Sequence, residues 1–326
     1  MRAVWALLLA GLLAAFLAAI AMGDQRLGLG QVLAALTGAP DTPAGTRMIV
    51  TGLRLPRALM AVLVGASLGV AGAVCQAIMR NPLAEPGLLG INAGAALAAT
   101  AIIIEFRTIP QDLLPVLTFA GALAMSAAIY AFSWRQGTSS VRIILIGIGL
   151  GALAGAGASF ISTFGDPPAV QRAMIWLSGS LQDSRWERVR MLALWAILPF
   201  VAAWLIAREL DLIAFGDTVA RGLGQRVNLL RGMAVLICAS LAGAAVAAAG
   251  LVGFVGLAAP HLARRLVGHA HARLIPASAL VGAILVLVAD LAARRIMPPV
   301  QLPVGLFTAL LGAPFFGFLL WKRRND

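Results

Sequence analysis

The sequence predicts an all-α membrane protein, and three observations support this prediction. Hydrophobic residues make up 61% of the 326 residues, charged residues make up only 12%, and the mean hydropathy is +0.94. A soluble domain of this length could not bury so much apolar surface, so the lipid bilayer must solvate most of it. The apolar runs are continuous rather than alternating, which favours a helical bundle over a membrane β-barrel.

The apolar runs also predict the number and order of the spans. A spanning helix needs about 20 apolar residues, so the chain can hold about ten helices with short connections. No internal repeat or low-complexity linker divides the chain, and residues 1–326 are expected to form a single transmembrane domain. The expected spans lie near residues 3–22, 58–79, 88–104, 113–133, 142–163, 191–207, 229–249, 251–266, 276–296 and 304–321.

The ends of the chain indicate its orientation. The apolar run after Arg2 is longer than the apolar part of a typical signal peptide, so an uncleaved first span is favoured over a cleaved leader. An even number of spans puts both termini on one side, and the basic tail Lys322-Arg323-Arg324 favours the cytoplasm. The net charge of +12 reflects arginines in short loops better than it reflects a nucleic-acid site. Many arginines still fall outside, which suggests that some bind a partner.

Three polar stretches separate the spans. Residues 23–53 are expected to form an outer loop with one short helix near 29–36. Residues 165–168 predict a turn, and 173–181 a short helix that re-enters the membrane. Residues 208–228 form the longest polar stretch on the inner side.

Glycines mark places where helices are expected to pack closely. Gly65 and Gly69 share one helix face, and so do Gly147, Gly151 and Gly155. Small residues at this spacing let helix backbones approach each other in lipid.

The sequence contains no pattern typical of an enzyme or a metal site. Cys75 and Cys238 lie in apolar runs and are expected to be buried thiols. His261 has no second ligand at a suitable spacing, so we expect no metal or haem ligand there. No phosphate-binding loop and no nucleophile–base pair is visible, and no catalytic residue or cofactor is expected. Asp290 is the clearest ionisable residue within a span, and it lies near the end of that span.

Two segments carry polar chemistry that a lipid-facing helix does not need. Arg54 and Arg57 flank Pro56, and guanidinium groups pair well with carboxylates of a partner, although arginines at helix ends also reach for the membrane interface. Arg294 has the same two interpretations, and it could also pair with Asp290 one helical turn earlier.

Two further polar segments connect spans on the inner side. The prolines of Asn81-Pro82-Leu83-Ala84-Glu85-Pro86-Gly87 predict a rigid turn between two spans. Residues 217–221 predict a short amphipathic helix that Gly222 and Gly224 can end. Such a helix suits docking to a soluble partner, but a solvated connecting helix explains the spacing equally well.

These segments together resemble one family. The runs 54–57, 81–90, 253–261 and 301–316 occur in the order seen in the permease subunits of type II ABC importers for iron–siderophore complexes, haem or vitamin B12 (FecCD and BtuC-like permeases). Some positions depart from the family pattern. Asp217 stands where the family usually has Glu, and Gln301 stands where it often has Glu.

The resemblance implies roles for specific residues. Arginines facing the periplasm dock a substrate-binding protein, the inner segment 210–228 couples the permease to its ATPase, and two inner loops close the pathway. The docking residues implied are Arg54, Arg57 and Arg294. The coupling residues implied are Phe215, Gly216, Asp217, Val219, Ala220, Arg221, Leu223 and Gly224. The cytoplasmic gate residues implied are Asn81, Leu83, Ser139 and Ser140.

The resemblance also implies a function. We expect the membrane-spanning subunit of an ATP-driven importer in the bacterial inner membrane, moving a ferric siderophore by alternating access, with haem or cobalamin as alternative cargo. Its expected partners are a second permease copy or paralogue, two cytoplasmic ATPase subunits and a periplasmic or lipid-anchored binding protein. ATP and Mg would bind the ATPase and not this chain. A secondary transporter or channel is the rival, but it predicts acidic residues in the middle of the spans, where none is seen.

Overall fold

The structure is a computed structural model that describes residues 1–23, 25–106, 108–135, 137–297 and 300–324. The side chains of the Lys322-Arg323-Arg324 tail and of Phe315 and Phe316 lie outside the described residues, so the orientation that we infer from the tail stays a prediction. The described part is built from helices, and its only β pairing is an isolated bridge between Met297 and Val300.

The expected spans each correspond to a helix, which confirms the predicted fold class. Seven helical segments are long and apolar enough to cross a membrane by themselves. α5, α13 and the apolar part of α15 are shorter. The helices are α1 (Arg2–Ala21), α4 (Leu55–Met79), α5 (Ile91–Ile104), α6 (Leu114–Phe132), α7 (Ser140–Phe164), α9 (Trp186–Leu205), α12 (Val227–Ala249), α13 (Val255–Val267), α14 (His271–Arg295) and α15 (Val304–Arg324).

The outer loop expected over residues 23–53 is shorter than predicted. α2 (Leu29–Thr37) confirms the expected short helix, but α3 (Ala44–Arg47) and a π-helical turn (Met48–Arg54) continue directly into α4. The continuous helix therefore runs from residue 44 to residue 79. Pro56 does not end it, because the wider π-helical turn before the proline accommodates a residue that lacks a backbone N–H.

The short helix of the 164–190 stretch also begins earlier than predicted. α8 (Pro167–Leu177) starts at the first proline of the expected turn and ends before Leu181. Proline is favoured in the first turn of a helix, where its missing N–H would have no intrahelical partner and its φ angle is already helical. The Pro167-Pro168 pair is therefore a helix start and not part of a turn.

A central group of helices forms the core of the bundle. α4, α12 and α14 are mostly buried, and α4 packs along α14, α12 and α13. The remaining long helices expose large apolar side chains, such as Leu145 and Leu198, as expected of surfaces that face lipid or another membrane subunit. Cys75 and Cys238 are buried and unpaired, as predicted.

Close packing through glycine is confirmed at some of the expected positions. A methyl group on Gly65 would collide with the backbone of Gly282, and one on Gly69 with the carbonyl of Ser278. On α7 only Gly147 is in such contact, against the carbonyl of Leu88. Gly155 has open space around it within the described part of the chain, so close packing at that end of α7 stays a prediction.

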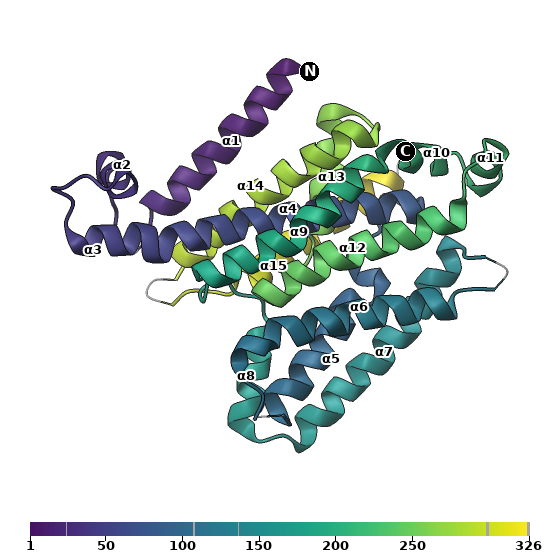
Figure 1. Cartoon of the computed structure of the whole chain (residues 1–326), viewed down its shortest axis with the longest axis horizontal. Coiled ribbons are helices and arrows are strands. Elements are labelled where there is room, and N and C mark those ends of the chain that lie inside the picture. Colours follow the sequence, from purple (N-terminus) through teal and green to yellow (C-terminus); the bar gives the residue numbers. More distant parts are fainter. Residues whose placement is uncertain (24, 107, 136, 298–299, 325–326) are drawn as a thin grey trace.

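The two ends of the bundle are chemically distinct. α2 and α3 lie at one end, with the start of α4, and α10 (Ala207–Ile213) and α11 (Asp217–Gly222) lie at the opposite end (Figure 1). α5, α6, α7 and α8 form a group beside the core, and the loop between α6 and α7 points toward the α11 end. We call the α2 end the outer end and the α11 end the inner end.

Candidate functional sites

The outer end carries a cluster of arginines around one buried carboxylate. Arg57 Nη2 lies 2.9 Å from Asp290 Oδ1, and Arg57 Nε donates to both carboxylate oxygens at 3.1 Å. Arg294 Nε lies 3.1 Å from Asp290 Oδ2, which confirms the pairing expected within α14. The Asp290 side chain is only 3% exposed. Two guanidinium groups thus share the Asp290 carboxylate.

A cavity opens above this cluster. Its volume is about 680 Å³, and Arg54, Arg57, Arg294 and Gln301 line part of its wall. Arg57 Nη1 donates to Gln301 Oε1 at 2.8 Å, so the charged guanidinium meets a neutral amide where a glutamate would form an ion pair. The structure therefore brings the three predicted docking arginines to one cavity, although Arg57 and Asp290 are 233 residues apart in sequence.

Arg54 makes contacts of a different kind from those of Arg57. Its Nη1 donates to the carbonyls of Ile20 and Ala21 at 2.8 and 3.0 Å, and its Nη2 donates to the carbonyl of Gln25 at 2.6 Å. The carbonyls at the end of a helix have no intrahelical partner and carry partial negative charge. Arg54 therefore caps α1 and fixes the chain that follows it.

The inner end contains the short helix predicted from residues 217–221. α11 begins at Asp217 and includes Gly222, and its backbone continues through a positive φ at Gly224. Phe215, Val219 and Leu223 are strongly exposed apolar residues at this end, whereas Ala220 is buried. Exposed apolar side chains on a polar connecting segment favour contact with a protein partner over a purely solvated helix.

Asp217 is held by two arginines from other parts of the chain. Arg231 Nη2, on α12, lies 3.0 Å from Asp217 Oδ1, and the Arg231 side chain is completely buried. Arg80 Nη2, at the end of α4, lies 4.0 Å from the same oxygen. Asp217 therefore links α11 to two elements of the bundle.

The four predicted gate residues lie in two adjacent inner turns. The Asn81 side chain accepts a hydrogen bond from the backbone N–H of Leu83 at 2.9 Å and so shapes the turn after α4. Ser139 caps α7, accepting from the Arg142 N–H at 3.3 Å. Ser140 Oγ donates to the carbonyl of Ile78 at 2.9 Å, which joins the start of α7 to the end of α4.

The turn after α4 also contains a largely buried carboxyl group. Glu85 precedes the 3₁₀ turn Pro86–Leu89, and burial raises the pKa of its carboxyl above the ordinary value. Desolvation disfavours the charged form of a carboxyl group, so the proton is held more tightly here than on an exposed glutamate. The Glu85 carboxyl group is therefore a weaker acid than an exposed glutamate.

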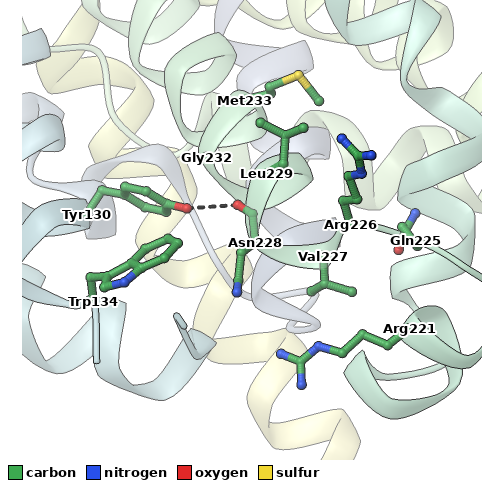
Figure 2. Close-up of a pocket in the computed structure, with 10 residues that line it drawn as sticks. All are labelled: Tyr130, Trp134, Arg221, Gln225, Arg226, Val227, Asn228, Leu229, Gly232 and Met233. Carbon is green, nitrogen blue, oxygen red and sulfur yellow. Dashed lines mark hydrogen bonds between the residues drawn. The ribbon is translucent and has the colours of Figure 1, made fainter. Parts of the chain in front are cut away.

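Two cavities lie at the inner end. One, of about 730 Å³, lies between the end of α4, α10 and α13, and basic side chains including Arg80, Arg264 and Arg265 line it. The other, of about 630 Å³, lies between the ends of α6 and α12 (Figure 2). There the Tyr130 hydroxyl donates to the carbonyl of Asn228 at 2.8 Å and so joins α6 to α12.

Sequence reasoning missed one contact and one residue that organise these sites. It indicated the pairing of Asp290 with Arg294 but not the contact of Asp290 with Arg57, because nothing local links those two residues. The missed residue is Arg231; an arginine inside an apolar span is costly and usually has a specific partner. That cost is the signal that could have identified it. Among the described residues, no group of three His, Cys, Asp or Glu side chains is placed to hold a metal ion.

Comparison with known proteins identifies the family. The FecCD transport family matches residues 11–322. The chain belongs to this family. Its members are permease subunits of ABC importers, and the chain is accordingly a multi-pass permease of the bacterial cytoplasmic membrane.

Several permeases of this kind are similar to the chain over most of its length. The Fe(3+)-citrate import system permease protein YfmE of Bacillus subtilis is 43% identical over 272 residues, which are 83% of this chain and 81% of that protein. The achromobactin transport system permease protein CbrC of Dickeya dadantii is 40% identical, covering 96% and 89%. The hemin transport system permease protein HmuU of Yersinia pestis is 38% identical, covering 98% and 97%.

The fold agrees with that of a solved transporter. A metal-chelate type ABC transporter in an inward-facing conformation superimposes with a TM-score of 0.88 at 30% sequence identity, covering 98% of this chain and 99% of that chain. The arrangement of helices is therefore that of an ABC importer permease, as predicted.

Proposed function

We propose that the chain is the membrane-spanning subunit of an ATP-driven importer for ferric siderophores. The observation that carries this proposal is the pairing of an arginine-lined outer cavity with an exposed short helix at the opposite end of one helical bundle of this family. The outer end suits docking of a loaded binding protein, and the inner end suits contact with an ATPase subunit. The whole chain acts as a single transmembrane permease domain.

The energy for transport comes from a separate ATPase. Two copies bind ATP and Mg at the inner end, each against residues 210–228 of one permease, while a second permease copy or paralogue completes the pathway. The coupling contact is made by Phe215, Val219, Leu223 and their neighbours in α11. The turns with Asn81, Leu83, Ser139 and Ser140 close the inner mouth of the pathway. This chain itself catalyses no reaction and holds no cofactor.

The cargo is an iron chelate. Two relatives with broad coverage are named for ferric citrate and achromobactin, and another for iron(3+)-hydroxamate, which favours ferric siderophores as a class. Haem is the second candidate, because the hemin permease of Yersinia pestis covers nearly the whole chain at 38% identity.

The binding protein docks on the outer arginines through its carboxylates. Arg57 and Arg294 supply charged N–H groups at the cavity wall, and Arg54 adds positive charge while it holds the end of α1. Guanidinium–carboxylate pairs are directional and remain charged at all physiological pH values. They also steer the encounter between the two proteins.

Arg57→Gln tests this docking surface. Binding of the loaded binding protein to the permease–ATPase complex in nanodiscs is expected to weaken by about tenfold or more, since losing one charged partner across an interface costs over ~1.4 kcal/mol. Asp290 keeps Arg294 as its counter-ion in this variant, so the fold is expected to survive. Biosensor measurement of the dissociation constant at two salt concentrations gives the result.

Arg26→Gln is the matched control, because Arg26 is exposed at the same end but does not line the cavity. It should leave the dissociation constant close to that of the unmodified complex. Equal weakening by both variants would reduce the effect to general surface charge and contradict a specific site.

A further inference from the structure

A completely buried arginine connects the segment proposed to contact the ATPase with the second gate turn. Arg231 lies in the first turns of α12 and binds Asp217 of α11 through Nη2, at 3.0 and 3.2 Å. Through Nη1 it donates to the carbonyl and hydroxyl oxygens of Thr138, at 2.7 and 3.2 Å. Thr138 directly precedes Ser139 and Ser140, so one guanidinium group bridges the two elements.

Thr138 is fixed to α12 by a second residue as well. Its backbone N–H donates to Asn228 Oδ1 at 3.3 Å, while the carbonyl of Asn228 accepts the Tyr130 hydroxyl (Figure 2). Asn228 at the start of α12 thus holds the turn between α6 and α7 through Thr138, and it holds the end of α6 through Tyr130. Movement of this part of α12 must carry the turn with it.

Asp217 reaches the first gate turn by a looser contact. Arg80 ends α4 in a left-handed conformation immediately before Asn81, and its guanidinium lies 4.0 Å from Asp217. The Arg80 side chain is 43% exposed, whereas that of Arg231 is 0% exposed. Ion pairs exposed to water are weak and screened, so the buried contact with Arg231 is the stronger of the two.

Because the Arg231 side chain is buried, its contacts with Asp217 and Thr138 are costly to break. Removing a guanidinium from water is unfavourable unless its charge is balanced and its N–H groups find acceptors. The Thr138 oxygens and the Asp217 carboxylate accept from Nη1 and Nη2 only in one relative position of α11 and the turn. Displacing α11 alone would separate Asp217 from Arg231 and leave the buried guanidinium without this carboxylate. The two elements are therefore favoured to move together.

We infer that Arg231 is the positioning residue that transmits displacement of α11 to the gate turn at Thr138–Ser140. This inference rests on the proposed function, since it takes α11 as the contact with the ATPase and the turn as a gate. The Arg231 side chain is itself completely buried. Its role is to keep the coupling helix and the turn in a fixed relation.

The test compares transport with ATP hydrolysis in the full complex. Permease, ATPase and binding protein are reconstituted in liposomes, and ferric siderophore uptake and phosphate release are measured on the same samples. Arg231→Met keeps the length and apolar stem of the side chain, and Asp217 retains Arg80 nearby. The number of siderophores moved per ATP is expected to fall by ~10-fold, within the usual range of coupling between sites, while hydrolysis continues.

Two further variants separate coupling from folding. Arg231→Lys keeps the charge but cannot bridge two partners with a planar fork, so it should also lower the transport ratio. Asp217→Asn added to Arg231→Met should lower it no further, because both remove the same connection. Arg208→Met, at an exposed arginine of α10, is the control and should keep the ratio of the unmodified complex.

A distance measurement gives a readout that stability alone would not move. Spin labels at Thr218 on α11 and Arg135 in the α6–α7 turn can be placed selectively, because both native cysteines are buried. Their separation is expected to stay constant on ATP binding in the unmodified chain and to change in Arg231→Met.

Each outcome has a definite meaning. An unchanged transport ratio and an unchanged label separation in Arg231→Met would overturn the inference while leaving the importer intact. An unmodified complex that hydrolyses ATP but moves no siderophore would instead contradict the proposed function.

Discussion

Asp290→Ala is expected to destabilise the protein more than any other single charge removal at its outer end. The side chain is 3% exposed and is the shared counter-ion of Arg57 and Arg294. Without it, two largely buried guanidinium groups both lose this carboxylate. Removing one partner of a buried ion pair costs about 3–5 kcal/mol. Thermal unfolding of the purified permease in detergent should show a clearly lowered midpoint and a reduced yield of folded protein.

Asp183→Ala provides the matched control at the same end of the molecule. Asp183 also contacts two arginines, Arg185 and Arg188, at 3.1 and 2.8 Å, but its side chain is 54% exposed. Exposed pairs of this kind contribute only ~0–1 kcal/mol. Similar unfolding midpoints for the two variants would mean that Asp290 is not the electrostatic centre of the outer cluster.

Gly72→Ala is expected to disrupt the core by separating two helices. A methyl group at this position on α4 would overlap the backbone of Gly256 at the start of α13, and a backbone atom cannot move aside as a flexible side chain can. Inserting a methyl group into a well-packed core typically costs ~1–3 kcal/mol, and a backbone collision belongs at the upper end of that range. The midpoint of thermal unfolding should fall, and binding of the ATPase should weaken with it.

Gly155→Ala is the control for this substitution. Gly155 lies in α7, and a methyl group there would meet no other atom within 4 Å. Because alanine favours helix more than glycine does, this variant should be neutral or slightly stabilising. A loss of stability equal to that of Gly72→Ala would show that the close approach of α4 and α13 is not what requires glycine.

The sequence predicted the order of the helices well, because the length and continuity of apolar runs are set by the bilayer. It predicted helix ends less well. The extension of the α4 helix back to residue 44 and the start of α8 at Pro167 both involve prolines. Proline is tolerated in the first turn of a helix or after a π-helical turn, so it does not mark a helix end at these positions.

The candidate sites divide in a similar way. The sequence indicated Arg57, Arg294 and Asp217 because their residue types stand out at the ends of apolar runs. It could not indicate the contact between Arg57 and Asp290, or the one between Arg231 and Thr138, because these pairs are far apart in the chain and only tertiary packing joins them. The contact of Arg54 with the last carbonyls of α1 could not be predicted from the sequence for the same reason.

ATP-dependent uptake of a chelated metal tests the central claim most directly. The permease, its ATPase and its binding protein are placed in liposomes with ATP enclosed, and radioactive iron is presented outside as ferric siderophore or as haem. We expect iron to accumulate inside only with ATP and the binding protein, and more with ferric siderophore than with haem. Uptake that needs neither ATP nor the binding protein, and that follows an ion gradient, would contradict it.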